Sequence, residues 1–146
     1  MHRALVVFAA FALGATAVAA QNTTVIKDRK EHFKAMGKAV KPVSAMYKGE
    51  EDFDLAKVQA AIGVIKEKAP ILPTLFPDDA KTGDDTEALP VIWDKKADFE
   101  ARFKKLGEAA LAAEAAIKDE DTFPDAWKTL MGNCSGCHKE FRKPKS

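Results

Sequence analysis

The charges of this chain are nearly balanced, with 23 basic and 22 acidic residues among 146. Such a balance excludes the strongly basic surfaces that bind nucleic acids or anionic membranes. Once a leader segment is removed, the remaining length fits one domain that is large enough to bury a core.

The first twenty residues have the composition of a secretory signal peptide. A basic residue, Arg3, precedes an apolar run that ends in small residues at Ala20. The run is marginal in length for a membrane span, and its small-residue end favours cleavage after Ala20 or Ala19. We therefore predict an exported, periplasmic protein without a membrane anchor, whose residues 21–146 form one domain. Removing Arg3 leaves 23 − 1 = 22 basic residues against 22 acidic ones, so this domain is formally neutral.

Residues 23–48 show the periodicity of an amphipathic helix. Apolar side chains recur in alternating steps of three and four, the stripe of a helical bundle. Arg29 interrupts the stripe, and a side chain that snorkels to solvent would account for it. Pro42 should kink the helix or loosen its last turns. The stripe consists of Ile26, Phe33, Met36, Val40, Val43 and Tyr47.

Residues 54–69 predict a second helix, with Asp52 or Asp54 as its N-cap and Pro70 after its end. A connection over residues 70–95 follows, which contains four prolines. A structureless segment of this length usually carries function or crosses the fold. We therefore expect it to cross from one end of the domain to the other.

Residues 96–118 and 124–141 predict the third and fourth helices. The apolar positions of each step alternately by four and three, and both cysteines fall on the stripe of the last helix. Together with the short joins and the single long crossover, these segments predict an all-α, antiparallel four-helix bundle. The two stripes are Phe99, Phe103, Leu106, Ala110, Ala113 and Ile117, and Phe123, Trp127, Leu130, Cys134, Cys137 and Phe141.

The last helix carries Cys134-Ser135-Gly136-Cys137-His138, the attachment signature of c-type haem. Thiols three residues apart share one face of a helix, as addition to two vinyl groups on one porphyrin edge requires. His138 rises on the same face, and a neutral imidazole suits iron as a ligand. We predict one haem c, attached inside the bundle through Cys134 and Cys137, with His138 as the metal ligand.

Other interpretations of the two cysteines are weaker. A thioredoxin-type motif would be expected near a βαβ pattern, which is missing from the sequence. A structural zinc site needs about four Cys or His ligands, whereas the other histidines are only His2 and His32. An exported chain with an even pair of cysteines normally suggests a disulfide, but a disulfide leaves the histidine after the motif unexplained.

The signal peptide, the four helices and the C-terminal haem motif together resemble the cytochrome c′ family of class II cytochromes c, which includes cytochrome c-556. Further marks of the resemblance are Arg29, Leu72-Pro73, Phe76-Pro77 and Pro90-Val91-Ile92-Trp93. The resemblance implies that the first-helix arginine lies near the haem propionates. It also implies a homodimer formed through the first two helices.

The resemblance assigns roles to four further positions. Arg142 matches an arginine beside the proximal histidine, and Glu87 matches an acidic residue of the haem-facing loop. Lys30 stands where glutamine is common, and we include it among the haem-contacting residues. The distal residue of the family lies four positions after the first-helix arginine and is Met in low-spin c-556 proteins. Here it is Phe33, which has no atom that binds iron.

Three other side chains are candidates for a sixth iron ligand. Met36 lies one turn beyond Phe33 but fits the core, and Met46 lies further along the same helix. His32 is rotated by about 100° from Phe33 and should be exposed. We therefore expect five-coordinate, high-spin iron with an apolar distal face that Phe33 gates.

The function implied by the resemblance is the binding of small diatomic gases (nitric oxide and carbon monoxide), electron transfer to a redox partner protein, or both. A six-coordinate, low-spin electron carrier of the c-556 type remains the alternative, with Met36 as the sixth ligand. A haem enzyme such as a peroxidase is a third hypothesis, and it is the weakest because it would need a distal histidine. We predict that the protein is not an enzyme.

Overall fold

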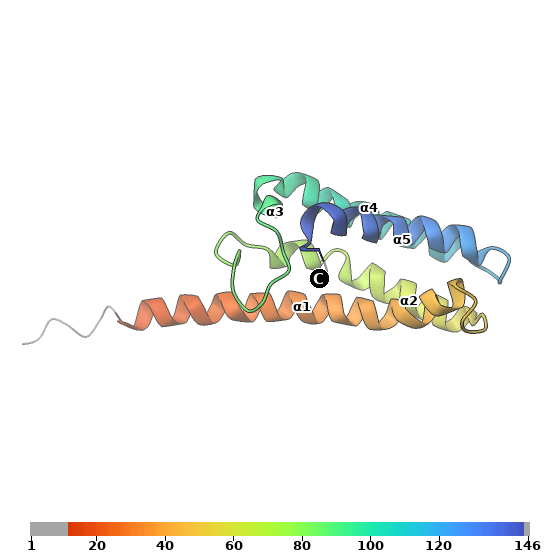
Figure 1. The fold of residues 1–146 in the computed structure, drawn as a ribbon, viewed down its shortest axis with the longest axis horizontal. Coiled ribbons are helices and arrows are strands. Elements are labelled where there is room, and N and C mark those ends of the chain that lie inside the picture. Colours follow the sequence, from red (N-terminus) through yellow and green to blue (C-terminus); the bar gives the residue numbers. More distant parts are fainter. Residues whose placement is uncertain (1–11, 145–146) are drawn as a thin grey trace, which may run out of the picture.

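The computed structural model describes residues 12–144, with side chains from Thr23 onward. Within these residues four long helices pack into an elongated bundle (Figure 1), and the only β-pairing is one isolated bridge between Ala88 and Arg142. The predicted all-α four-helix bundle is therefore confirmed. The elements are α1 (Ala12–Tyr47), α2 (Leu55–Lys68), the short 3-10 helix η1 (Leu72–Leu75), α3 (Val91–Asp94), α4 (Lys96–Ala116) and α5 (Phe123–Phe141).

The first helix is longer than the sequence predicts. α1 begins at Ala12 and so includes residues 12–20 of the predicted signal peptide, while residues 1–11 lie outside the described part of the chain. Cleavage of the leader stays a prediction. The helix also continues through Pro42 to Tyr47, because Val43 and Met46 after the proline are buried and hold the last turn in place. None of the helices that the structure describes is both long and apolar enough for a membrane crossing.

Of the two predicted N-caps of the second helix, the structure shows Asp54, directly before Leu55. Asp54 has an extended backbone, and its side chain accepts a hydrogen bond from the Lys57 backbone N–H at 3.1 Å. This bond satisfies one of the donors that a helix N-terminus leaves unpaired. Four of its apolar side chains are buried in the core: Val58, Ala61, Ile62 and Ile65.

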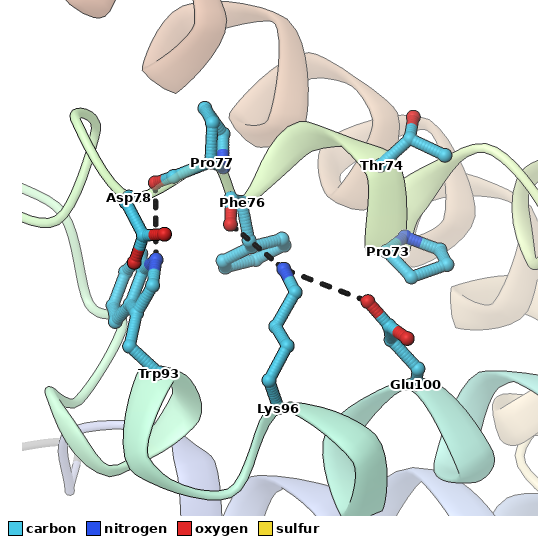
Figure 2. Close-up of a pocket in the computed structure, with 8 residues that line it drawn as sticks. All are labelled: Pro73, Thr74, Phe76, Pro77, Asp78, Trp93, Lys96 and Glu100. Carbon is cyan, nitrogen blue, oxygen red and sulfur yellow. Dashed lines mark hydrogen bonds and ion pairs between the residues drawn. The ribbon is translucent and has the colours of Figure 1, made fainter.

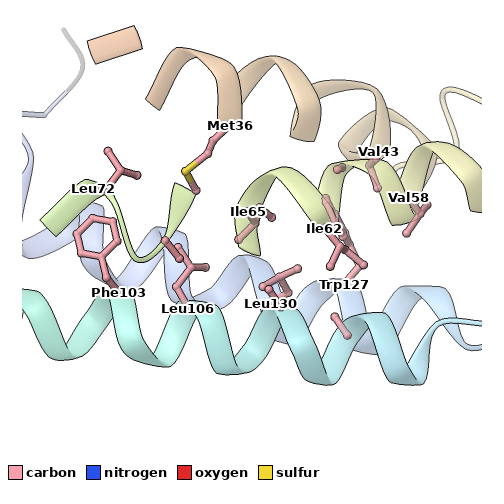
Figure 3. Close-up of a cluster of buried hydrophobic side chains, with 14 of the residues drawn as sticks. Met36, Val43, Val58, Ile62, Ile65, Leu72, Phe103, Leu106, Trp127 and Leu130 are labelled. Atoms are coloured by element: carbon pink, nitrogen blue, oxygen red, sulfur yellow. The ribbon is translucent and has the colours of Figure 1, made fainter. Parts of the chain in front are cut away.

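The core runs along the axis of the bundle, as the close-up in Figure 3 shows. The predicted stripes of α4 and α5 supply much of it, with Trp127 and Leu130 among the most completely buried side chains. Burial of each large apolar side chain contributes about 1.5–3 kcal/mol. The closest packing is between α1 and α2, between α2 and α4, and between α4 and α5. The fourth side of the bundle, between α1 and α5, is packed much more sparsely.

The predicted crossover is confirmed, but it contains two short helices, η1 and α3, and is not structureless. Inside the crossover, the Trp93 indole N–H of α3 donates to the Pro77 carbonyl at 3.0 Å. Lys96, the first residue of α4, ties the crossover to that helix by donating to the Phe76 carbonyl at 2.7 Å. The return stretch of the crossover passes over α1 and reaches the end of α5 (Figure 1). It therefore closes the sparsely packed side of the bundle.

Candidate haem-binding site

The last turns of α5 present the whole C-x-x-C-H motif. Cys134 and Cys137 are half-buried, lie against the hydrophobic core and are free thiols, whereas His138 is exposed. Burial raises the pKa of the Cys134 thiol and raises that of Cys137 to about 11. Both thiols are therefore protonated at neutral pH. The sequence predicted that both cysteines face the interior of the bundle. In the structure they pack against the edge of the core and are half-buried.

Arg29 from α1 is buried within the bundle and does not snorkel. Only 2% of the residue is exposed, and its guanidinium lies over the Phe76 ring, 4.6 Å from the centroid. It donates to the Ala80 carbonyl at 3.0 Å and to the Thr86 hydroxyl at 2.8 Å. Both acceptors are neutral, and no described carboxylate lies within 4.0 Å of the guanidinium, so its charge is not neutralised. Burial accordingly lowers the pKa of Arg29.

Lys30 and the crossover are joined on the neighbouring face of α1. The Lys30 ammonium donates to the Asp84 backbone carbonyl at 2.8 Å and lies 3.7 Å from the Asp84 carboxylate. Three consecutive residues of this turn, Gly83, Asp84 and Asp85, have φ of 109°, 45° and 50°. Such left-handed backbone is costly outside glycine. The observed role of Lys30 is thus to hold a tight turn of the crossover.

Glu87 and Arg142, which the resemblance placed separately near the haem, form an ion pair with each other. The Arg142 Nε donates to the Glu87 carboxylate at 2.6 Å, and a second guanidinium nitrogen contacts the same oxygen. Backbone bonds accompany the pair: Leu89 N–H donates to Phe141 O at 3.0 Å, and Lys143 N–H donates to Glu87 O at 2.8 Å. The crossover is therefore fastened to the residues that follow the haem motif.

Phe33 lies between aromatic rings of two other segments, the crossover and α4. It is half-buried, with its centroid 6.5 Å from that of Phe76 and 6.3 Å from that of Phe103. Met36, one turn further along α1, is 8% exposed and belongs to the core cluster, as predicted. Met46 is likewise a buried core residue.

His32 differs from its prediction. It is half-buried where exposure was expected. The pKa of Glu67 on α2 is lowered first by its hydrogen bond with Lys68 and, to a smaller degree, by the charge of His32. The imidazole therefore lies near α2 and not beside Phe33, where a distal ligand would stand.

A hollow in the structure lies apart from the haem motif (Figure 2). It encloses about 330 Å³ between η1 and the start of α4, and none of the motif residues lines it. Its polar side chains are already paired, since Lys96 bonds to the Phe76 carbonyl and lies 3.8 Å from Glu100. Phe76 connects this hollow to the Arg29 site, because the same ring lies under the guanidinium.

The residues fit a covalently attached haem on three grounds. Two half-buried thiols stand at the edge of the core with an imidazole directly after them. A buried cation without a described counter-charge suits a propionate. The α1–α5 side, which carries these groups, is the sparsely packed side of the bundle. Within residues 23–144 the structure shows no cluster of three His, Cys, Asp or Glu side chains that could hold a metal ion.

A four-helix bundle with a C-x-x-C-H motif at the end of its last helix defines a class of c-type haem proteins. The comparisons with known proteins place the chain within that class. A family model described as cytochrome c′ matches residues 24–142, and the chain belongs to this family. It is 48% identical over 128 residues to a cytochrome c′ of Rhodopseudomonas palustris, covering 88% of each chain.

A second relative and a solved structure, both from the same organism, also match the chain. A cytochrome c-556 is 35% identical over 146 residues and 97% of each chain. The solved structure of a cytochrome c′ superposes with a TM-score of 0.81 at 49% identity, covering 84% of this chain and 98% of that one. Proteins of this family carry covalently attached haem c and serve in electron transport, so the cofactor prediction is confirmed.

Some residues of the site were not found from the sequence. The Ala80 carbonyl and the Thr86 hydroxyl bind Arg29 from 51 and 57 positions away. Thr86 is a buried polar residue, only 8% exposed. The lone cation on the stripe of α1 signalled that partners were needed, but no local pattern identified them.

Proposed function

We propose that this chain is an exported haem protein whose iron keeps one coordination position open for nitric oxide or carbon monoxide. The observation that carries the proposal is the position of Phe33. It is half-buried beside the Phe76 ring on which Arg29 lies, and its phenyl group offers no lone pair to iron. When bound, the haem supplies an iron centre that binds diatomic gases and exchanges single electrons with a redox partner.

In this proposal each side chain of the site has a defined task. The Cys134 and Cys137 sulfurs hold the porphyrin edge, and the His138 imidazole binds iron as a neutral ligand. The Arg29 guanidinium accepts a propionate next to its bonds with Ala80 and Thr86. The aromatic side chains around Phe33 exclude water and anions, which leaves small uncharged gases as the favoured ligands.

Lys30, Glu87 and Arg142 act in this proposal by fixing the crossover over the site. Lys30 binds Asp84 of the crossover from α1, and Arg142 pairs with Glu87 of the crossover from the end of α5. The cytochrome c-556 relative supports the alternative, a low-spin electron carrier. In that case Met36 would have to leave the core, where it is now 8% exposed, and this cost favours the five-coordinate form.

Export and assembly are parts of the same proposal. The leader in residues 1–20 directs the chain to the periplasm, where c-type haem is attached. A homodimer forms through α1 and α2. Sedimentation of the mature holoprotein tests the dimer, and N-terminal sequencing of protein recovered from the periplasm tests cleavage after Ala20 or Ala19.

An optical spectrum of the ferrous holoprotein tests the proposed coordination. We expect a high-spin spectrum that changes when carbon monoxide is added. A low-spin ferrous spectrum that carbon monoxide leaves unchanged would contradict the open position and favour the electron carrier with a sixth protein ligand.

A further inference from the structure

Three charged side chains form a chain of ion pairs along the α4–α5 contact, next to the haem motif. Lys95, directly before α4, donates to one carboxylate oxygen of Glu140 at 2.8 Å. Arg102 on α4 donates to the other oxygen at 3.0 Å. The carboxylate is thus held from both sides, and the cluster of two cations and one anion keeps one positive charge.

Arg102 reaches across to the motif itself. Its second terminal nitrogen lies 3.5 Å from the position that a Cβ on Gly136 would occupy. The guanidinium therefore lies against the turn between the two cysteines. Its charge also acts on the Cys137 thiol, where it opposes the effect of burial. Both observations place the guanidinium beside the second haem-attachment residue.

Arg102 contacts α5 on a different side of the helix from His138, the predicted iron ligand. Glu140 follows His138 by two residues, which is about 200° around a helix. Arg102 and Glu140 thus lie on the α4 side, and the imidazole rises on the other. Arg102 therefore lies beside Cys137 and not beside the iron ligand. It can affect the haem only through its positive charge and through its contact with the turn between the two cysteines.

We propose that Arg102 is a positioning residue that places a fixed positive charge beside the Cys137 link and thereby raises the reduction potential of the attached haem. Reduction of ferric to ferrous haem adds one electron, so a nearby cation favours the reduced form. Glu140 and Lys95 hold the guanidinium in place. The inference rests on the haem attachment common to the family and holds whether the iron binds gases or only exchanges electrons.

A purely structural ion pair would behave differently. Exposed pairs contribute little to folding, and Arg102 and Glu140 have 42% and 30% exposed side chains. Arg102→Gln and Glu140→Gln both break the pair, so a structural role predicts potential shifts in the same direction. The charge mechanism predicts opposite directions, since one variant removes a cation and the other removes an anion.

The experiment is redox titration of the holoprotein and its variants at low and high ionic strength. We expect Arg102→Gln to lower the potential, Glu140→Gln to raise it and Arg102→Lys to stay close to the parent. The control is Lys104→Gln, which removes one positive charge two residues further along α4, at a side chain that is 80% exposed and faces Glu108. This control should shift the potential less than Arg102→Gln, and high salt should shrink every shift.

Two outcomes would overturn the proposal: shifts of the same sign in Arg102→Gln and Glu140→Gln, or a Lys104→Gln shift as large as that of Arg102→Gln. If Arg102→Gln yields no holoprotein, the remaining variants decide. A potential of Glu140→Gln at or below the parent value then overturns the proposal. Thermal unfolding of each variant shows whether a shift reflects loosened packing.

Discussion

Arg142, the residue after α5, is ion-paired with Glu87 of the crossover, 55 positions earlier in the chain. Lys30 and Arg29 bind the same crossover from α1. The segment is therefore held from two sides, by α1 and by the end of the helix with the haem motif. Its position depends on both halves of the site.

The Glu87–Arg142 pair should contribute only modestly to stability. Glu87 has a 57% exposed side chain, and exposed pairs contribute about 0–1 kcal/mol. The backbone bonds of Leu89 and Lys143 remain when the side chains are changed. A double-mutant cycle with Glu87→Gln and Arg142→Gln, measured by urea unfolding, should give a coupling below about 1 kcal/mol. A much larger coupling would mean that the pair also holds the attached haem.

Replacing Arg29 should disturb both the fold and the haem. Arg29→Leu removes the hydrogen bonds to the Ala80 carbonyl and to the Thr86 hydroxyl, which then keeps only its bond from the Ala88 N–H. Hydrogen bonds of a charged group contribute about 1.5–3 kcal/mol each, so the variant should be less stable. It also removes the cation expected to face a propionate, so the reduction potential should shift. Arg29→Lys keeps the charge and is the control, with a smaller shift in potential. An unchanged potential of Arg29→Leu over the whole pH range would contradict the propionate assignment.

The sequence predicted the four long helices, although not the early start of α1 or the two short helices of the crossover. A stripe repeats within a few residues and needs no distant partner, so it can be recognised locally. The stripe positions Phe99, Phe103 and Leu106 are buried as predicted. The contacts of Arg29 could not be found this way, since they depend on the path of the crossover. That path turns at Gly83, Asp84 and Asp85, which have left-handed backbone. Aspartates do not by themselves specify such a turn, so the partners of Arg29 appear only in three dimensions.

The N-cap of α2 should give a pH-dependent part of the stability. The Lys57 backbone N–H bonded to Asp54 lowers the pKa of this carboxyl below its ordinary value in the folded state. Its contribution is therefore present above the unfolded-state pKa and is lost as the pH falls through the folded-state pKa. Asp54→Asn keeps an acceptor without the charge. The stability difference between parent and variant should shrink in acid, as measured by urea unfolding from neutral to acidic pH. A constant difference would contradict this prediction.

Haem attachment should be required for a well-packed fold. We expect the haem to fill space on the α1–α5 side, and an empty cavity costs about 24 cal/mol per Å³. Cys134→Ala combined with Cys137→Ala should give a chain with helical far-ultraviolet circular dichroism but a broad thermal transition. Ser135→Ala, an exposed position between the cysteines, is the control and should unfold as the parent does. A sharp transition and native-like helix content in the double variant would refute the requirement.

Phe33 should act as the gate of the distal face. Its half-buried ring contacts the Phe76 and Phe103 rings and offers no ligand atom. In the proposed site it stands opposite His138 and crowds the sixth position of the iron. Phe33→Ala removes the obstruction, so stopped-flow mixing should show faster binding of carbon monoxide to the ferrous protein. Phe33→Met supplies a thioether and should convert the iron towards low spin. Met36→Leu is the matched control, since a core residue of similar volume should change neither the rate nor the spectrum. If Phe33→Ala binds no faster and Met36→Leu turns a low-spin parent high-spin, the sixth ligand is Met36 and the gate is not Phe33.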